Sequence, residues 1–244
     1  MDGLTKAEVA KAEGRELQPA AKAIRPRDAA TLILIDRSGG EYRVLMGRRH
    51  AAHAFMPGKF VFPGGRTDPA DAGVAAAGEL HELELAKLMV VSRISGRRAR
   101  AIALSAIRET YEEAGLLIGR KGQFSAKAAD WKGFVDHDVR PSLDGLRFIA
   151  RAITPPGAVR RFDTRFFAAW RDDVAVELPY GPTNELEEVV WLRLADARAA
   201  DIPLITKTVL EGLEARLAAD PQLEPGAAVP FFRMVGNRFR RDVL

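Results

Sequence analysis

The stretch Arg108-Glu109-Thr110-Tyr111-Glu112-Glu113-Ala114-Gly115-Leu116 decides how this chain is interpreted. On a helix its three glutamates, at positions i, i+3 and i+4, share one face. Carboxylates held that close repel one another, and a hard divalent cation, which takes oxygen ligands, would relieve the repulsion. The alternative is a solvated helix face on which Arg108 pairs locally. Gly115 is expected to end the helix, because helices often end at a residue with positive φ.

A glycine turn, Phe62-Pro63-Gly64-Gly65, lies upstream. The two segments together resemble the Nudix hydrolase signature, which reads Gly, five residues, Glu, seven residues, Arg-Glu-apolar-any-Glu-Glu-any-Gly-apolar. Its second half matches from Arg108 to Leu116, with Thr110 at the apolar position, and Gly65 corresponds to the first Gly. Gly65 lies 43 positions before Arg108 instead of 14, an insertion of 29 residues. Arg100 stands where the signature has its first Glu.

The resemblance implies a fold and a chemistry. The fold is an α/β/α sandwich around a mixed β-sheet. The reaction is attack of water on a diphosphate in a nucleoside diphosphate derivative, assisted by Mg²⁺ or Mn²⁺. Glu112 and Glu113 are implied as the main metal ligands, Glu109 as a ligand or an orienting group, and Arg108 as the residue that holds a glutamate in place. Gly64 and Gly65 would offer backbone groups to the metal or the phosphates, since glycine permits close approach.

Composition limits the classes of protein to consider. The 244 residues are 47% hydrophobic and 29% charged, which is ordinary for a globular protein. The absence of cysteine excludes disulfides, thiol catalysis and cysteine-based zinc sites. A net charge of +4 without a dense Lys/Arg run argues against a nucleic-acid arm. No apolar run has the length of a membrane span or a signal peptide, so a soluble, cytoplasmic protein is expected.

Apolar patterning predicts the elements along the chain. We expect an N-terminal arm over residues 1–27 and one domain over 28–244, with helical insertions at about 66–100 and 122–145. A β-hairpin is expected over 30–48 and a helix over 97–114. The remaining expected elements are strands at 59–62, 146–153, 161–170 and 189–194, an inserted helix within 78–91, a helix at 205–218 and a C-terminal tail.

Arginines near the expected site could bind phosphates, because guanidinium groups make bidentate contacts to phosphate oxygens. The expected substrate-binding residues are Arg49, Gly64, Gly65, Arg66, Arg161 and Arg165, and Arg48 is a further candidate. Segments 55–65 and 154–167, with the insertion, are similar to the peroxisomal coenzyme A diphosphatase subgroup. That similarity implies coenzyme A or an acyl form as substrate. Of the broader coenzyme A pattern, Leu45, Met46, Arg49 and Gly58 fit, whereas His53 and Ala54 replace its Leu-Arg pair.

Several assignments stay open at this stage. A carboxylate of the insertion could replace the missing signature Glu, and the candidates are Glu79, Glu82 and Glu84. A general base could be Glu185, Glu187 or Glu188, or a metal-bound hydroxide could need none. The four histidines have no metal-ligand spacing. Other functions in view are hydrolysis of ADP-ribose or dinucleotides, a non-catalytic nucleotide-binding module, and RNA processing. A homodimer is also open.

Overall fold

The computed structural model describes residues 1–13, 24–50, 58–91, 94–158 and 160–244. Within them, the main sheet has nine strands. Its order is β10 (Leu186–Arg193), β2 (Arg43–Arg49), β1 (Arg27–Asp36), β8 (Phe162–Trp170), β7 (Arg147–Ile153), β11 (Pro230–Val235) and β12 (Arg238–Val243), with β3 (Phe60–Val61) on β2 and β4 (Gly64–Arg66) on β1. A smaller sheet has the order β6 (Val139–Pro141), β5 (Leu116–Lys121) and β9 (Val174–Glu177).

The sheet is mixed, and β1 is an interior strand with three partners. Along its whole length β1 pairs in parallel with β8, from Arg27–Phe162 to Ile35–Trp170. Its other edge is shared by two antiparallel partners: β2 pairs near Ile35, and β4 pairs near Ala30. The turn that carries Gly64 and Gly65 is therefore hydrogen-bonded directly to β1.

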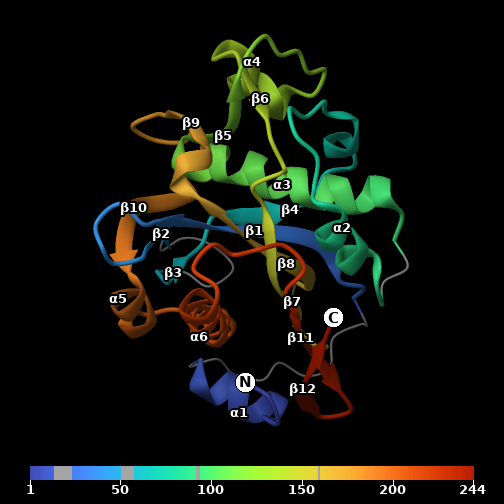
Figure 1. The fold of residues 1–244 in the computed structure, drawn as a ribbon. Coiled ribbons are helices and arrows are strands. Elements are labelled where there is room, and N and C mark those ends of the chain that lie inside the picture. The colour runs from blue at the N-terminus through green and yellow to red at the C-terminus, as the bar shows by residue number, and fades with distance from the viewer. Residues whose placement is uncertain (14–23, 51–57, 92–93, 159) are drawn as a thin grey trace.

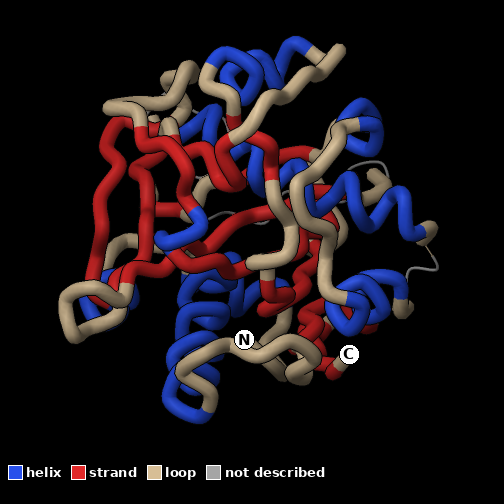
Figure 2. Tube along the Cα trace, turned by 45° about the horizontal axis from the view of Figure 1, so that its top comes forward, coloured by secondary structure: helices blue, strands red, loops and turns tan. Residues whose placement is uncertain are grey.

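Helices cover both faces of the sheet (Figure 1). The long helix α3 (Gly96–Ala114) packs on one face, where it meets Leu32 and Leu34 of β1. The helix α6 (Leu204–Ala219) packs on the other face against Ile33 and Ile35. Because β1 is buried on both faces, it reads as a continuous apolar run and not as an alternating one. Figure 2 shows the strands as a layer with helices on either side.

Local signals set the ends of α3. The Ser95 side chain accepts a hydrogen bond from the Arg98 backbone N–H at 3.3 Å, which satisfies one free donor of the first turn. At the other end Gly115 adopts φ 74° and donates its N–H to the Tyr111 carbonyl at 2.9 Å. The prediction that Gly115 ends this helix is confirmed.

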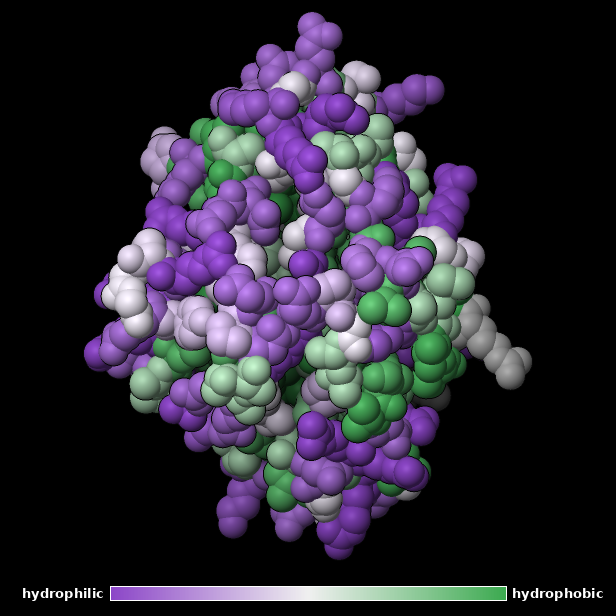
Figure 3. Space-filling view, viewed as in Figure 1, coloured by the Kyte–Doolittle hydropathy of each residue, from purple (hydrophilic) through white to green (hydrophobic). Residues whose placement is uncertain are grey.

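The inserted segment is only partly helical. Asp68 caps a short 3₁₀ turn, η1 (Pro69–Gly73), and α2 (Glu82–Met89) follows, so the inserted helix is shorter than 78–91. Leu83, Met89, Val90 and Val91 are exposed, and hydrophobic residues gather over this region in Figure 3. Whether this face serves a homodimer stays a prediction.

The second predicted insertion, 122–145, is mostly not helical. Only η2 (Ala129–Trp131) and α4 (Lys132–Asp136) are helical there, and β6 then pairs with β5. Three further features differ from expectation: β5 and β9 form the small sheet, α5 (Leu194–Ala199) follows β10, and residues 230–243 form the hairpin β11–β12 where we expected a tail. These strands are stabilised by distant partners, which local patterning does not reveal.

The expected arm over 1–27 contains α1 (Lys6–Ala12), which is stabilised by a capping box between Thr5 and Glu8. The division at residue 27 stays a prediction. Within the described ranges, no helix is both long enough and apolar enough to cross a bilayer.

Candidate active site

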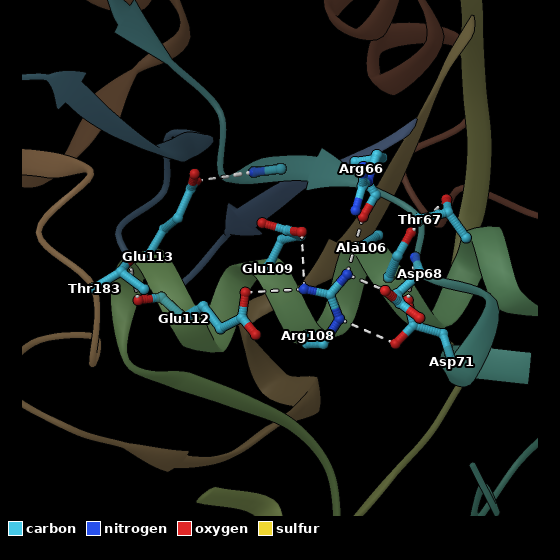
Figure 4. A network of polar contacts seen from close by, with 12 residues as sticks. Arg66, Thr67, Asp68, Asp71, Ala106, Arg108, Glu109, Glu112, Glu113 and Thr183 are labelled. Atoms are coloured by element: carbon cyan, nitrogen blue, oxygen red, sulfur yellow. Dashed lines mark hydrogen bonds and ion pairs between the residues drawn. The ribbon is translucent and has the colours of Figure 1, made fainter. Parts of the chain in front are cut away.

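Arg108 of α3 is buried at the centre of the candidate site (Figure 4). Its Nη1 donates to Glu109 Oε1 and to Glu112 Oε2, both at 2.9 Å, and its Nη2 donates to the Arg66 carbonyl at 3.0 Å. Nε donates to Asp71 Oδ1 at 3.0 Å, and Nη2 also reaches Asp71 Oδ2 at 3.2 Å. Burial alone would lower the pKa of Arg108, but the Asp71 hydrogen bond and the surrounding carboxylates hold it above its usual value. The guanidinium is therefore a fixed cation that orients two glutamates.

Glu113 is held by the glycine turn. Its Oε2 accepts the Gly64 backbone N–H at 3.0 Å, and the side chain is almost wholly buried. Burial raises the pKa of Glu113 to about 8, against the lowering effects of the Gly64 hydrogen bond and the Arg49 charge. An added Cβ at Gly64 would lie 2.6 Å from the Ala30 carbonyl oxygen, so only glycine fits between β1 and this carboxylate.

Glu109 lies against the second glycine of the turn. A Cβ added to Gly65 would lie 2.4 Å from Glu109 Oε2 and 2.6 Å from Oε1. Burial raises the pKa of Glu109 to about 7; Arg108 lowers it, and Glu112 raises it further. The pKa of Glu112 is raised as well, again first by burial. All three carboxyl groups are therefore in surroundings that disfavour their negative charge.

The carboxylate oxygens of these three glutamates are chemically suited to bind a hard divalent cation. Carboxylate oxygens are the ligands such ions prefer, and a cation would offset the unfavourable burial of negative charge at Glu109, Glu112 and Glu113. In the conformation described, no three acidic or histidine side chains of the described residues already surround one point as ligands. Instead Glu109 and Glu112 face Arg108, while Glu113 faces Gly64. Binding an ion between them would require these side chains to reorient.

A cavity of about 500 Å³ opens beside this cluster. Four of the expected substrate-binding residues line it, and Arg108 and Glu109 lie on the same wall; the four are Arg49, Gly64, Gly65 and Arg66. Glu112 and Glu113 belong to the carboxylate cluster but are not among the lining residues.

The structure does not bring Arg161 or Arg165 to the cavity wall. Arg161 donates to the backbone carbonyls of Thr154 at 3.0 Å and Ile24 at 2.7 Å. Arg165 is buried on the α3 side of β8, where it pairs with Asp28 at 2.8 Å and Asp163 at 3.4 Å. Sequence alternation along β8 turns Arg165 away from its neighbours Thr164 and Phe166, which do line the cavity.

The carboxylates proposed to replace the missing Glu have other partners or lie at the surface. Glu79 pairs with Arg100 at 2.8 Å, and buried Glu84 accepts the backbone N–H groups of Phe148 and Gly226. Glu82 is exposed. The acidic residue of the insertion that joins the cluster is Asp71, which sequence reasoning missed. Its position as the third residue of a capping box was the available signal.

Of the three glutamates considered as a general base, only Glu185 lines the cavity. Its charge also contributes to the raised pKa of Glu109 and of Glu113. Glu187 lies 3.5 Å from His50 Nε2, and Glu188 pairs with Arg48 at 2.8 Å. His81 caps α2. His53 and Ala54, which depart from the coenzyme A pattern, lie outside the described residues.

Comparison with known proteins indicates which class of protein the chain resembles. No protein-family model matches the chain. A Caenorhabditis elegans protein provisionally named nudix hydrolase 7 is 29% identical over 179 residues, which are 68% of this chain and 51% of that protein. The chain thus spans about half the length of this curated relative. The crystal structure of a Nudix hydrolase from Alicyclobacillus acidocaldarius is 28% identical and aligns with a TM-score of 0.60, over 78% of this chain and 92% of that one.

The mixed sheet between helices is the Nudix fold, and the glycine turn lies beside the glutamate helix within it. In sequence and in fold the chain is similar to hydrolases of the Nudix superfamily.

Proposed function

We propose that this protein hydrolyses the diphosphate linkage of a nucleoside diphosphate derivative with the help of Mg²⁺ or Mn²⁺. The observation that carries the proposal is the contact of the glycine turn with the glutamate helix, where Gly64 donates to Glu113 and Gly65 touches Glu109. This contact brings the α3 glutamates beside a cavity that Glu109, Arg49 and Arg66 line.

Each residue has a separate task in this proposal. A bound divalent cation supplies charge neutralisation and a lowered pKa for coordinated water. Glu109, Glu112 and Glu113 would hold it, and Arg108 keeps the first two in position. Arg49 and Arg66, which line the cavity, would bind phosphate oxygens. Gly64 and Gly65 keep the cavity wall free of side chains next to the carboxylates.

Glu185 is the residue we propose as general base, if the reaction uses one. It lines the cavity from the segment before β10, across from the α3 carboxylates. A Glu185→Gln variant should then retain substrate binding and lose turnover, with the loss smallest at high pH, where hydroxide replaces the base. Unchanged turnover would favour a metal-bound hydroxide without a separate base.

For the substrate we propose coenzyme A or an acyl-coenzyme A, split into 3′,5′-ADP and a phosphopantetheine. Support comes from the similarity of segments 55–65 and 154–167 to the coenzyme A diphosphatase subgroup, although residues 55–57 lie outside the described part of the chain. ADP-ribose and dinucleotides are the alternatives, together with a module that binds a nucleotide without cleaving it.

The test is a hydrolysis screen with Mg²⁺ across coenzyme A, ADP-ribose, NADH, diadenosine polyphosphates and nucleoside triphosphates. We expect Glu112→Gln to abolish turnover of the preferred compound. The melting temperature of this variant should be equal to or higher than that of wild type. Glu82→Gln, an exposed glutamate of α2, is the matched control and should keep full activity. Full activity of Glu112→Gln would overturn the metal-ligand assignment, and preference for ADP-ribose or a dinucleotide would overturn the coenzyme A assignment.

A further inference from the structure

The cavity extends well beyond the carboxylate cluster, and its far part has a different lining. Six apolar side chains from α1, β8, α6, β12 and the residue after β3 line it, namely Val9, Phe62, Phe162, Phe166, Ile205 and Phe239. Threonine side chains of β1, β8 and α6 also line the cavity. Two charged residues, Glu13 and Arg160, also lie on this wall. We call this part of the cavity the apolar chamber.

One wall of the apolar chamber comes from the α1 segment, residues 1–13, which is fixed to both of its neighbours. The Gly3 N–H donates to the Phe239 carbonyl at 2.9 Å, and the Phe239 N–H donates to the Leu4 carbonyl at 2.8 Å. At its other end the Glu13 carboxylate accepts the Leu204 N–H at 3.2 Å. The segment therefore joins the β11–β12 hairpin to the start of α6 and places buried Val9 on the chamber wall.

The chemistry of this wall indicates what it would receive. The cavity that Arg49 and Arg66 line is the same one that the apolar chamber belongs to, so the rest of a substrate whose diphosphate lies near these arginines can extend into the chamber. Glu13 and Arg160 apart, the side chains named above provide no charged partner for a second charged group, whereas burying hydrocarbon against the apolar ones is favourable, at about 0.8 kcal/mol for each methylene.

We propose that the α1 segment is part of the substrate site and that the apolar chamber receives an apolar group joined to the diphosphate. The proposal rests on the diphosphatase function given above. In it, the carboxylate cluster sets the reaction and the α1 segment, with α6 and the β11–β12 hairpin, sets which substituent is accepted.

Binding of non-hydrolysable probes separates this proposal from the catalytic one. The probes are α,β-methylene-ADP esterified at its terminal phosphonate with methyl, butyl or octyl alcohol, and titration calorimetry on the full chain gives their affinities. We expect affinity to rise about three- to fourfold for each buried methylene. A Val9→Asp variant should lose this dependence on chain length and keep its affinity for the methyl ester. The control Ala7→Asp, at an exposed position of the same helix, should behave as wild type.

Ile205→Asp tests the opposite wall, in case Val9→Asp detaches the whole segment. Loss of the chain-length dependence in both variants, with the methyl ester still bound, supports the proposal. Flat affinity across the esters in wild type overturns the chamber, and an effect of Ile205→Asp without one of Val9→Asp overturns the role of the α1 segment. If ester binding follows the expectation but no natural diphosphate is hydrolysed, the function fails and the chamber stands.

Discussion

The contact between Asp71 and Arg108 should contribute strongly to stability, and Asp71→Asn tests it. Asp71 Oδ1 accepts from Arg108 Nε and from the indole N–H of fully buried Trp131, both at 3.0 Å. Its Oδ2 accepts from Arg108 Nη2 at 3.2 Å and from the Asp68 N–H at 3.0 Å. In the asparagine variant the amide oxygen can serve one pair of donors, and the NH₂ group then faces the other two.

The magnitude follows from these contacts. Losing one charge-assisted hydrogen bond costs about 1.5–3 kcal/mol and a neutral one about 1 kcal/mol, and removing one partner of a buried ion pair costs about 3–5 kcal/mol. For a chain of this size, 3–4 kcal/mol corresponds to a fall in melting temperature of about 6–16 °C. Urea unfolding and a thermal scan of Asp71→Asn measure both quantities.

The matched control is Asp201→Asn, which removes the same charge from a pair with Lys59 whose aspartate side chain is 74% exposed. Exposed pairs contribute at most about 1 kcal/mol, so this variant should melt within a few degrees of wild type. Equal losses in the two variants would refute the reasoning, since burial would then have no effect on the value of the contact.

Three further outcomes are expected. Gly65→Ala should lower turnover by at least about tenfold, a loss of about 1.4 kcal/mol in transition-state stabilisation, because the new methyl group displaces the Glu109 carboxylate. Its control is Gly39→Ala, where the added Cβ meets nothing within 4 Å. Equal turnover in the two variants would contradict the contact between Gly65 and Glu109. Gly115→Ala should destabilise the fold by at least about 1 kcal/mol in urea unfolding, because φ is 74° and a backbone oxygen lies 2.7 Å from the added Cβ. The Asp36 pKa is lowered to about 2, first by the Ser38 backbone N–H and then by the Ser38 side chain and the Arg171 guanidinium, against the opposing effect of burial. Its ionised form therefore adds stability above the unfolded pKa, which is lost as pH falls towards 2; Asp36→Asn should be less stable at pH 7 by about 2 kcal/mol and should approach wild type near pH 2.

Features with local causes could be predicted from the sequence. The α3 helix has a serine cap, apolar residues at helical spacing and a terminal glycine, all within 21 residues, and its bounds were predicted to within one residue. The hairpin at β1 and β2 and the strands β7 and β8 have the same kind of local pattern. The contact of the glycine turn with the glutamates followed from the family resemblance, which supplies a non-local relation that patterning lacks.

Features with distant partners could not be predicted. Asp71 and Arg108 are 37 positions apart, and Asp71 and Trp131 are 60 apart. The sequence gives no sign of which arginine lines the cavity. Arg49 lines it, whereas Arg165 is buried against Asp28 because its position on β8 turns its side chain to the opposite face of the sheet. The β11–β12 hairpin depends on pairing with β7, and the wall formed by α1 depends on that hairpin.

The glutamates of α3 also affect conformational stability. A carboxyl group whose pKa is raised by folding is less stable as an anion in the native protein than in the unfolded chain, so Glu109 and Glu113 oppose folding at pH values above their usual range. Neutral glutamine at position 109 should therefore raise the melting temperature at pH 8 in a buffer with a metal chelator. Such a variant would be a more stable protein, and under the proposed function it would also bind the metal less well, so stability and activity would place opposite demands on this helix.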